Sequence, residues 1–569
     1  MYFQQPGTNY YVLAISAGKA GGATEQLLLE ALNATRSAGS VNTELIRLCD
    51  TDIHPCRGCN SCKRQPPKGG ADAFCVNQDD FTEIFEKIKF ADAILFGTPE
   101  DSCFPPAAAI RLLDRGFGIS RTYTDQCWSH RKYGAVIAVS GTRPTGYLIP
   151  ISVYLLHRFH KGITVADTVN IQLESPDSDI PQECRKRAFR TGKKIASALL
   201  RNEIYLEPPI IYYGDPSISY QLSPCPGCGN GIIRFTDENH FACGVCNSMG
   251  AFIIKDGRVF IQWDPESVKV NMLSYGGELV HRKNMDGNTN LKAPVRPEEE
   301  VRSALTSLMK EGLTVTPGDL PHPEPTGKSR RILGISAGRI LGNTETVLRA
   351  ALLEAEKVSP DIRTEMICLR DLKLSDPLCS EESTSKDDFQ WIMEQMKNAD
   401  AIILGAPAYC LLGPAEMMCL LQKCARLNEN STDTAYKKSP VAAIFSVAGG
   451  PRHTYLWDAE SLLLRSVHPG IHLIERQEFL YISEKAQIVF DEEKMARARE
   501  MGRHVADALF DDVPVLLEYQ FGRKGGCPRC GSMNIELHQD GSLCCPVCGT
   551  FGSISADSGK PELIWSISD

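Results

Sequence analysis

Short apolar runs alternate with amphipathic stretches along the first two hundred residues. Five runs have the length and β-branched content of strands; they are YYVLAIS, TELIRL, DAILFGT, YGAVIAVS and ITVADTVNI, at 10–16, 43–48, 92–98, 133–140 and 163–171. Three stretches show helical spacing of apolar residues; they are TEQLLLEALNAT, FTEIFEKIKF and RKRAFRTGKKIASALL, at 24–35, 81–90 and 185–200. This alternation predicts an α/β fold, with helices on both faces of a doubly wound parallel sheet.

The same pattern occurs a second time. RRILGISAGRILGNTETVLRAAL at 330–352 matches YYVLAISAGKAGGATEQLLLEAL at 10–32 nearly position for position. ADAIILGAP at 399–407 likewise matches ADAILFGTP at 91–99. Self-similarity on this scale indicates a tandem duplication, and each copy is followed by a cysteine-rich tail.

The duplication divides the chain into five parts, since 569 residues exceed what one hydrophobic core supports. We expect an α/β domain, a four-cysteine module, a polar linker with a short helix, a second α/β domain and a second four-cysteine module. These parts span 1–205, 206–264, 265–329, 330–512 and 513–569.

Composition excludes several classes of partner. The chain has 43% hydrophobic and 23% charged residues, as ordinary globular proteins do, and with a net charge of −9 nothing marks it as a binder of nucleic acid or anionic membranes. The N-terminal MYFQQPGTNYYVLAIS lacks the pattern of a signal peptide, and no apolar run approaches the ~20 residues that span a bilayer. We therefore expect a cytoplasmic protein that binds neither nucleic acid nor membrane.

Cysteine is the informative residue, because 22 occur in the chain. In a reducing compartment, clustered cysteines favour metal ligation over disulfides. Twelve of the 22 form three sets of four. The sets are Cys56, Cys59, Cys62 and Cys75; Cys225, Cys228, Cys243 and Cys246; and Cys527, Cys530, Cys545 and Cys548.

The first set has the spacing C-x2-C-x2-C-x12-C. Structural zinc sites use two separated C-x2-C knuckles, whereas three cysteines at successive x2 intervals are typical of an iron–sulfur run. We favour a [4Fe-4S] cluster, and zinc or a redox thiol set are the alternatives. The second copy is twelve residues shorter in this region and holds only Cys368 and Cys379.

The two tails share the spacing C-x2-C-x14-C-x2-C, which supplies the two knuckles of a zinc ribbon. In a small module with few strands, the metal provides folding energy that the core cannot. Mononuclear iron of the rubredoxin type is the alternative to Zn²⁺. Cys544, next to Cys545, is interpreted as a bystander.

Three loops that follow strands carry candidate ligand-binding residues. The first, SAGKAGGAT or SAGRILGNT, places glycines and side-chain donors before a helix N-terminus, which suits a phosphate, although a plain glycine-rich turn is the alternative. The dinucleotide spacing G-x-G-x-x-G is absent. The second, GTPEDSCFPP or GAPAYCLLGP, is stiffened by proline and suits the edge of a flat heterocycle. The third, SGTRPTGY or AGGPRHTY, adds glycine and a cation.

Together the three loops predict an FMN site in each copy. Its candidate residues are Ser16, Gly18, Thr24, Pro99 and Gly141 in the first copy, and Ser336, Gly338, Asn343, Thr344, Pro407, Ala408, Tyr409, Gly449 and Gly450 in the second. No catalytic residue stands out, because the cations and the histidine of the third loop are more simply read as surface residues.

The S-A-G-x5-T-E loop, the G-x-P motif and the cysteine loop resemble the NADPH-dependent FMN reductase superfamily, and the first half is similar to the iron–sulfur flavoproteins. The resemblance implies a flavodoxin-like fold, bound FMN and a [4Fe-4S] cluster on the cysteines after the second strand. Two features depart from it: the long gap before Cys75, and Glu100 and Asp101 where relatives carry an apolar and an aromatic residue. Tyr409 fits that pattern, so the first half has the better cluster site and the second the better flavin site.

We therefore expect an FMN-dependent oxidoreductase that relays electrons between the cluster, FMN and NAD(P)H or a ferredoxin-like donor, with an unidentified small-molecule acceptor. In the family that it resembles, the cluster of one subunit lies near the flavin of its neighbour. We accordingly expect the two halves to act as an internal pseudo-dimer, with further self-association left open. The alternatives are an NAD(P)H:FMN reductase that releases reduced flavin, and a non-catalytic zinc-ribbon scaffold.

Overall fold

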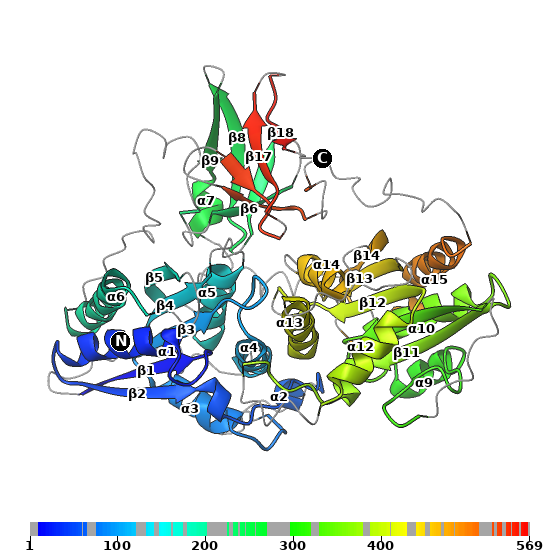
Figure 1. Cartoon of the computed structure of the whole chain (residues 1–569), viewed down its shortest axis with the longest axis horizontal. Coiled ribbons are helices and arrows are strands. Elements are labelled where there is room, and N and C mark those ends of the chain that lie inside the picture. The colour runs from blue at the N-terminus through cyan, green and yellow to red at the C-terminus, as the bar shows by residue number, and fades with distance from the viewer. Residues whose placement is uncertain are drawn as a thin grey trace. The chain divides into compact units, whose positions relative to one another are not determined.

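The computed structural model of the 569-residue chain contains two compact units (Figure 1). One unit holds 1–54, 60–286 and 523–569, and the other holds 55–59 and 287–522. The structure describes residues 9–59, 61–64, 75–120, 132–141, 147–160, 163–173, 179–201, 225–226, 231–236, 239–244, 246–255, 258–269, 296–319, 329–378, 387–409, 411–429, 440–449, 456–467, 471–482, 484–510, 526–527, 532–537, 542–547, 549–556 and 559–566.

The first α/β domain contains a five-stranded parallel sheet in the order β2-β1-β3-β4-β5. Its strands are β1 (Tyr10–Ser16), β2 (Val41–Arg47), β3 (Ala93–Pro99), β4 (Tyr133–Ser140) and β5 (Thr164–Gln172). The helices are α1 (Ala23–Arg36), α2 (Ser61–Arg64), α3 (Phe81–Phe90), α4 (Ala107–Ser120), α5 (Leu148–Phe159) and α6 (Gln182–Arg201), with the 3₁₀ turn η1 at Leu48–Asp50. This strand order is that of flavodoxin, so the predicted fold is confirmed.

Helices α1 and α6 pack closely together on one face of this sheet. The contact requires a glycine, because a Cβ on Gly192 of α6 would overlap the backbone carbonyl oxygen of Ala31 in α1. Ala31, Leu27 and Ile195 are fully buried in the core between these helices and the sheet.

The second α/β domain repeats this architecture in the order β11-β10-β12-β13-β14. Its strands are β10 (Arg330–Ser336), β11 (Ile362–Cys368), β12 (Ala401–Pro407), β13 (Val441–Val447) and β14 (His472–Phe479). Its helices are α10 (Asn343–Ala355), α12 (Phe389–Lys397), α13 (Ala415–Glu429), α14 (Leu456–Val467) and α15 (Glu492–Asp507), with 3₁₀ turns η3 (Leu369–Asp371) and η4 (Gln487–Phe490). Gly502 of α15 meets the carbonyl oxygen of Ala351 in α10 as Gly192 meets Ala31, so both copies use the same helix crossing.

Part of the predicted linker belongs to the second domain. The expected short helix is present as α9 (Glu298–Thr306), and its Val301 and Leu305 pack with η4. Farther on, the Val315 N–H donates to the Met366 carbonyl at 2.9 Å, and the Met366 N–H donates to the Leu313 carbonyl at 2.7 Å. Residues 296–319 therefore extend this domain beside β11, because apolar side chains such as Leu313 are buried in its core.

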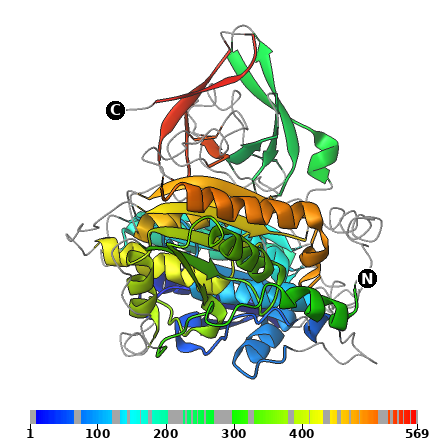
Figure 2. The ribbon, with the colours of Figure 1, turned by 90° about the vertical axis from the view of Figure 1, so that its right-hand side faces the viewer.

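The two cysteine-rich tails form one antiparallel sheet of eight strands, in the order β18-β17-β16-β15-β6-β7-β8-β9. The strands are β6 (Ile232–Phe235), β7 (His240–Cys243), β8 (Met249–Lys255), β9 (Arg258–Trp263), β15 (Asn534–Leu537), β16 (Ser542–Cys544), β17 (Phe551–Ser555) and β18 (Glu562–Trp565), and the helix α7 (Pro265–Lys269) follows β9. Figures 1 and 2 show these green and red strands side by side. The join is the pairing of β6 with β15, where Ile233 faces Ile535 in a shared core.

Two tails that were predicted as separate modules thus complete each other. Four-stranded tails of this size bury little apolar surface alone, and pairing them extends the core across both. Among the helices that the structure describes, none combines the length and the apolar character of a membrane span.

Candidate flavin and metal sites

The loop after β10 brings the predicted phosphate-binding residues of the second copy together. Ser336 is fully buried, and its hydroxyl oxygen accepts the N–H of Gly338 at 3.2 Å. A Cβ on Gly338 would lie 2.7 Å from the Cβ of Thr344, so only glycine fits this turn. The loop of the first copy has the same shape, with Ser16 and Gly18 in the corresponding places and the N–H···O distance at 3.4 Å.

In the first copy the turn is slightly more open. A Cβ on Gly18 would lie 3.0 Å from the Cβ of Thr24 and 3.6 Å from the ring of Pro99. The first loop and the rim after β3 are therefore adjacent in this copy, as an FMN site requires.

Both helices that follow the first loop begin without a side-chain cap. The residues at the N-cap positions are Gly22 before α1 and Gly342 before α10, and neither offers a side chain to the first turn. The first N–H groups of a helix have no intrahelical acceptor, and together with the helix dipole they attract an anion. The two uncapped N-termini therefore suit a phosphate.

A buried glutamate supports the first loop of the second copy. Glu345 accepts the N–H of Leu341 at 2.8 Å and forms ion pairs with Arg349 at 2.8 Å and Arg370 at 3.0 Å. Arg370 also donates to the carbonyl of Gly338 at 2.9 Å. The arginines neutralise a carboxylate that would otherwise repel a phosphate, and they fix the backbone around it.

In the first copy, the corresponding glutamate is neutralised by an arginine at a different position in the sequence. Glu25 accepts the N–H of Gly21 at 3.1 Å and two bonds from Arg47 at 2.7 and 2.8 Å, and the guanidinium lowers the pKa of this carboxyl. The sheet register places Arg47 where the second copy has Cys368. The second copy instead uses Arg370, two residues after Cys368. Each copy therefore has an arginine that pairs with its loop glutamate, but the two arginines are not at equivalent positions.

Asn343, a predicted cofactor ligand, holds the loop to the rest of its domain. Its side-chain NH₂ donates to the Glu484 carbonyl at 2.7 Å, and its side-chain oxygen accepts the Ile488 N–H at 3.1 Å. Sequence reasoning missed this supporting role, since 484–488 is far from Asn343 along the chain. Contact between Asn343 and a cofactor stays a prediction.

The rim after β12 forms a tight turn at the predicted position. Tyr409 and Leu412 exchange backbone hydrogen bonds of 2.7 and 2.9 Å, and Leu411 between them has a φ of 83°. Pro407, Ala408 and Tyr409 are half-buried, which leaves this edge open to a ligand. A left-handed non-glycine residue costs roughly 1–3 kcal/mol and is typical of functional loops.

The rim of the first copy has the same turn but different chemistry. Asp101 and Phe104 exchange backbone bonds of 2.8 and 3.1 Å, and Cys103 has a φ of 71°. The Glu100 carboxylate accepts the Cys103 N–H at 2.9 Å, and Asp101 is only 5% exposed. Two carboxyl groups therefore stand where the second copy has Ala408 and Tyr409.

The third loop is only partly covered by the structure. Gly141 is half-buried, and a Cβ there would meet nothing within 4 Å. Gly449 follows β13 as predicted, whereas Gly450 and the cations of this loop, Arg143 and Arg452, lie outside the described residues.

The first cysteine set follows η1 of the first domain. Cys56, Cys62 and Cys75 are half-buried and Cys59 is exposed. The division into units falls inside this set, because 55–59 group with 287–522. Residues 60 and 65–74 lie outside the described part of the chain, and joint ligation by the four thiols stays a prediction.

Within the unit formed by 55–59 and 287–522, the start of the cysteine loop is bonded to the first of the predicted flavin loops of the second copy. Arg339, in the first loop after β10, donates to the Gly58 carbonyl at 3.1 Å. Gly58 has a φ of 61°, and a Cβ there would lie 3.0 Å from the Tyr409 hydroxyl. Gly58 stands directly before Cys59, so a thiol of the first set is adjacent in sequence to a residue that is bonded to the first loop of the second copy and lies close to its rim.

The first tail gathers three of its predicted ligands. The sulfur atoms of Cys225, Cys243 and Cys246 all lie within 4.8 Å of one another, and all three side chains are buried. The Sγ atoms of Cys225 and Cys246 are 3.3 Å apart. Cys228 lies outside the described residues. Buried thiols at this spacing suit a tetrahedral metal site, and whether the ion is zinc or iron stays a prediction.

Three of the four predicted knuckles share one backbone geometry. In each, the N–H of the cysteine donates at 2.8 Å to the carbonyl five residues later; the pairs are Cys243–Ser248, Cys527–Ser532 and Cys545–Thr550. Such a turn closes the chain around the sulfur. Cys527 and Cys545 are fully buried in one cluster, while Cys530 and Cys548 lie outside the described residues.

We expect Cys243→Ser to remove one metal ion per chain, because an ion with three thiolates is held far less tightly than one with four. Metal analysis by mass spectrometry on purified protein measures this directly and distinguishes zinc from iron. Cys544→Ser is the matched control, because Cys544 lies in β16 opposite Glu536 and takes no part in a knuckle. Equal metal content in Cys243→Ser and unaltered protein would contradict the assignment.

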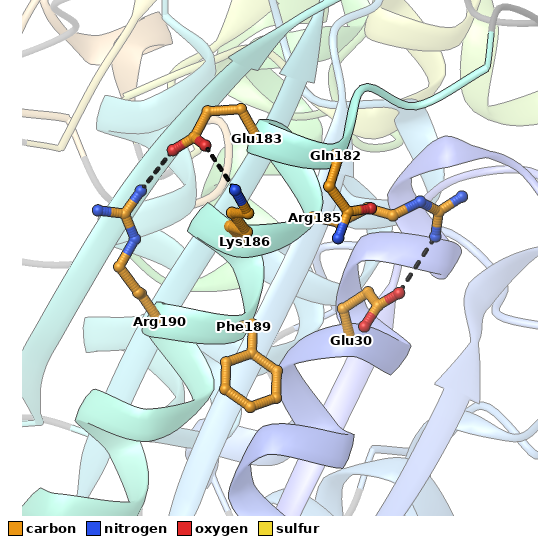
Figure 3. A pocket seen from close by; sticks show the side chains of 7 residues that line it. All are labelled: Glu30, Gln182, Glu183, Arg185, Lys186, Phe189 and Arg190. Atoms are coloured by element: carbon orange, nitrogen blue, oxygen red, sulfur yellow. Dashed lines mark hydrogen bonds and ion pairs between the residues drawn. The ribbon is translucent and has the colours of Figure 1, made fainter.

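A hollow of about 450 Å³ opens between α1 and α6 (Figure 3). Its cations are bound to neighbouring acids: Arg185 to Glu30 at 3.2 Å, and Lys186 and Arg190 to Glu183 at 3.6 and 2.9 Å. None of its lining residues belongs to the three predicted flavin loops. We therefore do not assign a ligand to it.

Several known proteins are similar to parts of this chain. An iron–sulfur flavoprotein of Methanocaldococcus jannaschii is 34% identical over 149 residues, which cover 26% of this chain and 70% of that protein. A flavone synthase of Aspergillus candidus is 26% identical over 263 residues, or 41% of this chain and 81% of that protein. A solved flavone reductase covers 42% of this chain and 81% of its own, at 24% identity and a TM-score of 0.35.

The family of NADPH-dependent FMN reductases matches residues 10–172 and 330–480, more than half of the chain. The two matched regions run from the first to the fifth strand of each parallel sheet, which confirms the predicted duplication of one family unit. The chain therefore belongs to the NADPH-dependent FMN reductase family and is a flavin-dependent oxidoreductase.

Proposed function

We propose that the protein relays electrons between a [4Fe-4S] cluster on Cys56, Cys59, Cys62 and Cys75 and an FMN bound by the second copy. NAD(P)H or a ferredoxin-like protein is the donor, and a small molecule is the acceptor. The observation that carries the proposal is the hydrogen bond from Arg339, in the first loop of the second copy, to the Gly58 carbonyl, at a place where a Cβ on Gly58 would meet the Tyr409 hydroxyl.

The residues of the second copy fit FMN. The turn at Gly338 admits no side chain, the helix after it starts uncapped, and the carboxylate of Glu345 is neutralised by two arginines. Tyr409 is half-buried at the rim, and an aromatic ring at this position suits stacking on a flavin. Bound FMN supplies hydride or single-electron chemistry, and an iron–sulfur cluster supplies single electrons.

The two copies differ in ways that favour the second as the flavin site. Asn343 anchors the first loop of the second copy to η4, where the first copy has Ala23. The first copy also places Glu100 and Asp101 at its rim, and carboxylates there oppose the negative charge that a flavin gains on reduction. The first copy is accordingly assigned the cluster and the second the flavin.

Arg339 holds Gly58, and with it the start of the cysteine loop, beside the second flavin site. Its side chain reaches the Gly58 carbonyl at 3.1 Å from the loop that is to bind phosphate. Such a restraint favours electron transfer from the cluster to the flavin, because the protein around them then has little need to rearrange during each transfer.

Cys59→Ala is expected to abolish the relay and to leave FMN bound. In anaerobically purified protein, reduced ferredoxin should then reduce the bound FMN more slowly by at least an order of magnitude, as followed by stopped-flow absorbance. Cys49→Ala is the control, because Cys49 lies in η1 outside the cysteine set. Unchanged FMN reduction in Cys59→Ala would overturn the relay.

The two alternative functions predict different results for the same purified protein. A reductase that releases its flavin would lose FMN during gel filtration, and a zinc-ribbon scaffold would be colourless and would contain zinc alone. The relay predicts retained flavin together with iron and inorganic sulfide. The acceptors to assay are quinones, nitro compounds and azo compounds, together with flavones because of the similarity to the flavone synthase of Aspergillus candidus.

A further inference from the structure

We propose that Arg115 closes the base of the cysteine loop and directs two spare N–H donors to the sulfur atoms of the cluster. The inference rests on the proposed cluster and goes beyond the relay, because it assigns a positioning residue outside the cysteine set. Arg115 lies in α4, and α2, which carries Cys62, packs against this helix.

Arg115 is buried without a full set of acceptors. Its side chain is 0% exposed, and its guanidinium lies 4.2 Å from the centre of the Phe81 ring. One nitrogen, Nη1, donates to the Asp79 carboxylate and to the His54 carbonyl. Among the described residues, Nε and Nη2 have no acceptor. A buried charged group whose donors are left unpaired is destabilising, so an acceptor is expected at this place.

The two groups that accept hydrogen bonds from Arg115 connect the two ends of the cysteine loop. His54 lies two residues before Cys56, and Asp79 lies four residues after Cys75. The His54 N–H donates to the Asp79 carboxylate at 2.8 Å, and Arg115 binds both residues. Burial would raise the pKa of Asp79, but the hydrogen bonds from Arg115 and the His54 N–H outweigh it and lower this pKa. Asp79 is therefore ionised and the closure is a charged one.

The second copy has the same closure without the spare donors. Lys423 in α13 pairs with Asp387 at 2.6 Å and donates to the Ser375 carbonyl at 3.2 Å, while the Ser375 N–H donates to Asp387 at 3.2 Å. Its ammonium lies 5.3 Å from the centre of the Phe389 ring. A lysine thus suffices to close a loop that lacks the four cysteines, and the arginine occurs where the cysteines occur.

The chemistry of the missing acceptor follows from this comparison. Thiolates and sulfides of a [4Fe-4S] cluster carry negative charge and accept N–H bonds, and such bonds stabilise a cluster and raise its reduction potential. Arg115 supplies both the positive charge and two free N–H groups beside the helix of Cys62. We assign these two donors to cluster sulfur.

The test exchanges the cations at the two equivalent positions, Arg115 and Lys423. Arg115→Lys gives the first copy the cation of the second and should keep the fold, as measured by thermal unfolding. We expect its iron to be lost to a chelator about tenfold faster, and its cluster to have a more negative midpoint potential in an EPR-monitored titration. Lys423→Arg is the matched control and should change neither quantity. Iron loss and potential unchanged in Arg115→Lys would overturn the proposal.

A second measurement needs no variant. In protein labelled with ¹⁵N in the arginine guanidinium groups, pulsed EPR of the reduced cluster should show coupling to ¹⁵N, and its absence would overturn the assignment. Failure of the underlying function looks different, because unaltered protein would then lack iron and sulfide altogether. That result would reject the relay and this inference together, whereas an intact cluster without coupling rejects the inference alone.

Discussion

Gly338→Ala weakens FMN binding by about 10- to 100-fold, whereas Gly18→Ala leaves most of the flavin bound. A Cβ at residue 338 would lie 2.7 Å from the Cβ of Thr344, a distance that real side chains do not reach. Thr344 is 3% exposed and follows Asn343, which is bonded to 484 and 488, so neither side can move freely. Overpacking of this kind costs about 1–3 kcal/mol, which corresponds to the stated loss of affinity. Fluorescence titration of the apoprotein with FMN measures it.

The pair of variants also decides which copy holds the flavin. The corresponding contact at Gly18 is 3.0 Å, and the first copy has no counterpart of the Asn343 anchor. If Gly18→Ala removed the flavin and Gly338→Ala did not, the first copy would be the FMN site. If both variants bound FMN normally, the first loop would not be a phosphate site. Circular dichroism of each variant shows whether the fold is retained.

Gly502→Ala destabilises the second domain by more than about 3 kcal/mol, and Gly192→Ala does the same to the first. The added Cβ overlaps the backbone carbonyl oxygen of Ala351 or of Ala31, and backbone at a helix crossing cannot turn aside as a side chain can. The two helices must therefore separate, which opens the core between them and the sheet. Urea unfolding followed by circular dichroism measures the shift in the midpoint of the affected domain.

Gly116→Ala in α4 is the control for this pair. The nearest atom to a Cβ at residue 116 is 3.6 Å away, an ordinary contact. Alanine is the better helix former by about 1 kcal/mol, so this variant should be neutral or slightly more stable. Equal tolerance of Gly502→Ala and Gly116→Ala would show that the crossing of α10 and α15 is not as close as described.

The sequence predicted those elements whose pattern is local. The runs at 10–16, 133–140 and 81–90 have the same bounds as β1, β4 and α3. The pattern of apolar and polar residues that predicts a strand or a helix depends only on consecutive residues. Helices α4 and α5 were missed. Nearly all of their described residues are buried, so no polar face marks the helical period.

The turns of the predicted flavin loops are local in sequence, whereas the contacts that support them are not. Ser336, Gly338 and Thr344 lie within nine residues of one another and form a motif. The bonds of Asn343 to 484–488 and of Arg339 to Gly58 join segments that are more than a hundred residues apart. Such contacts depend on tertiary packing, which a sequence read without an alignment does not specify.

The junction between β6 and β15 has a further consequence for the history of this chain. Because the sheet is completed only when both tails are present, a half-length ancestor with a single tail would have exposed the edge now covered in each repeat. Unprotected edges recruit a second copy, so such an ancestor was suited to assemble in pairs through its own tail. Gene fusion would have made that partnership permanent.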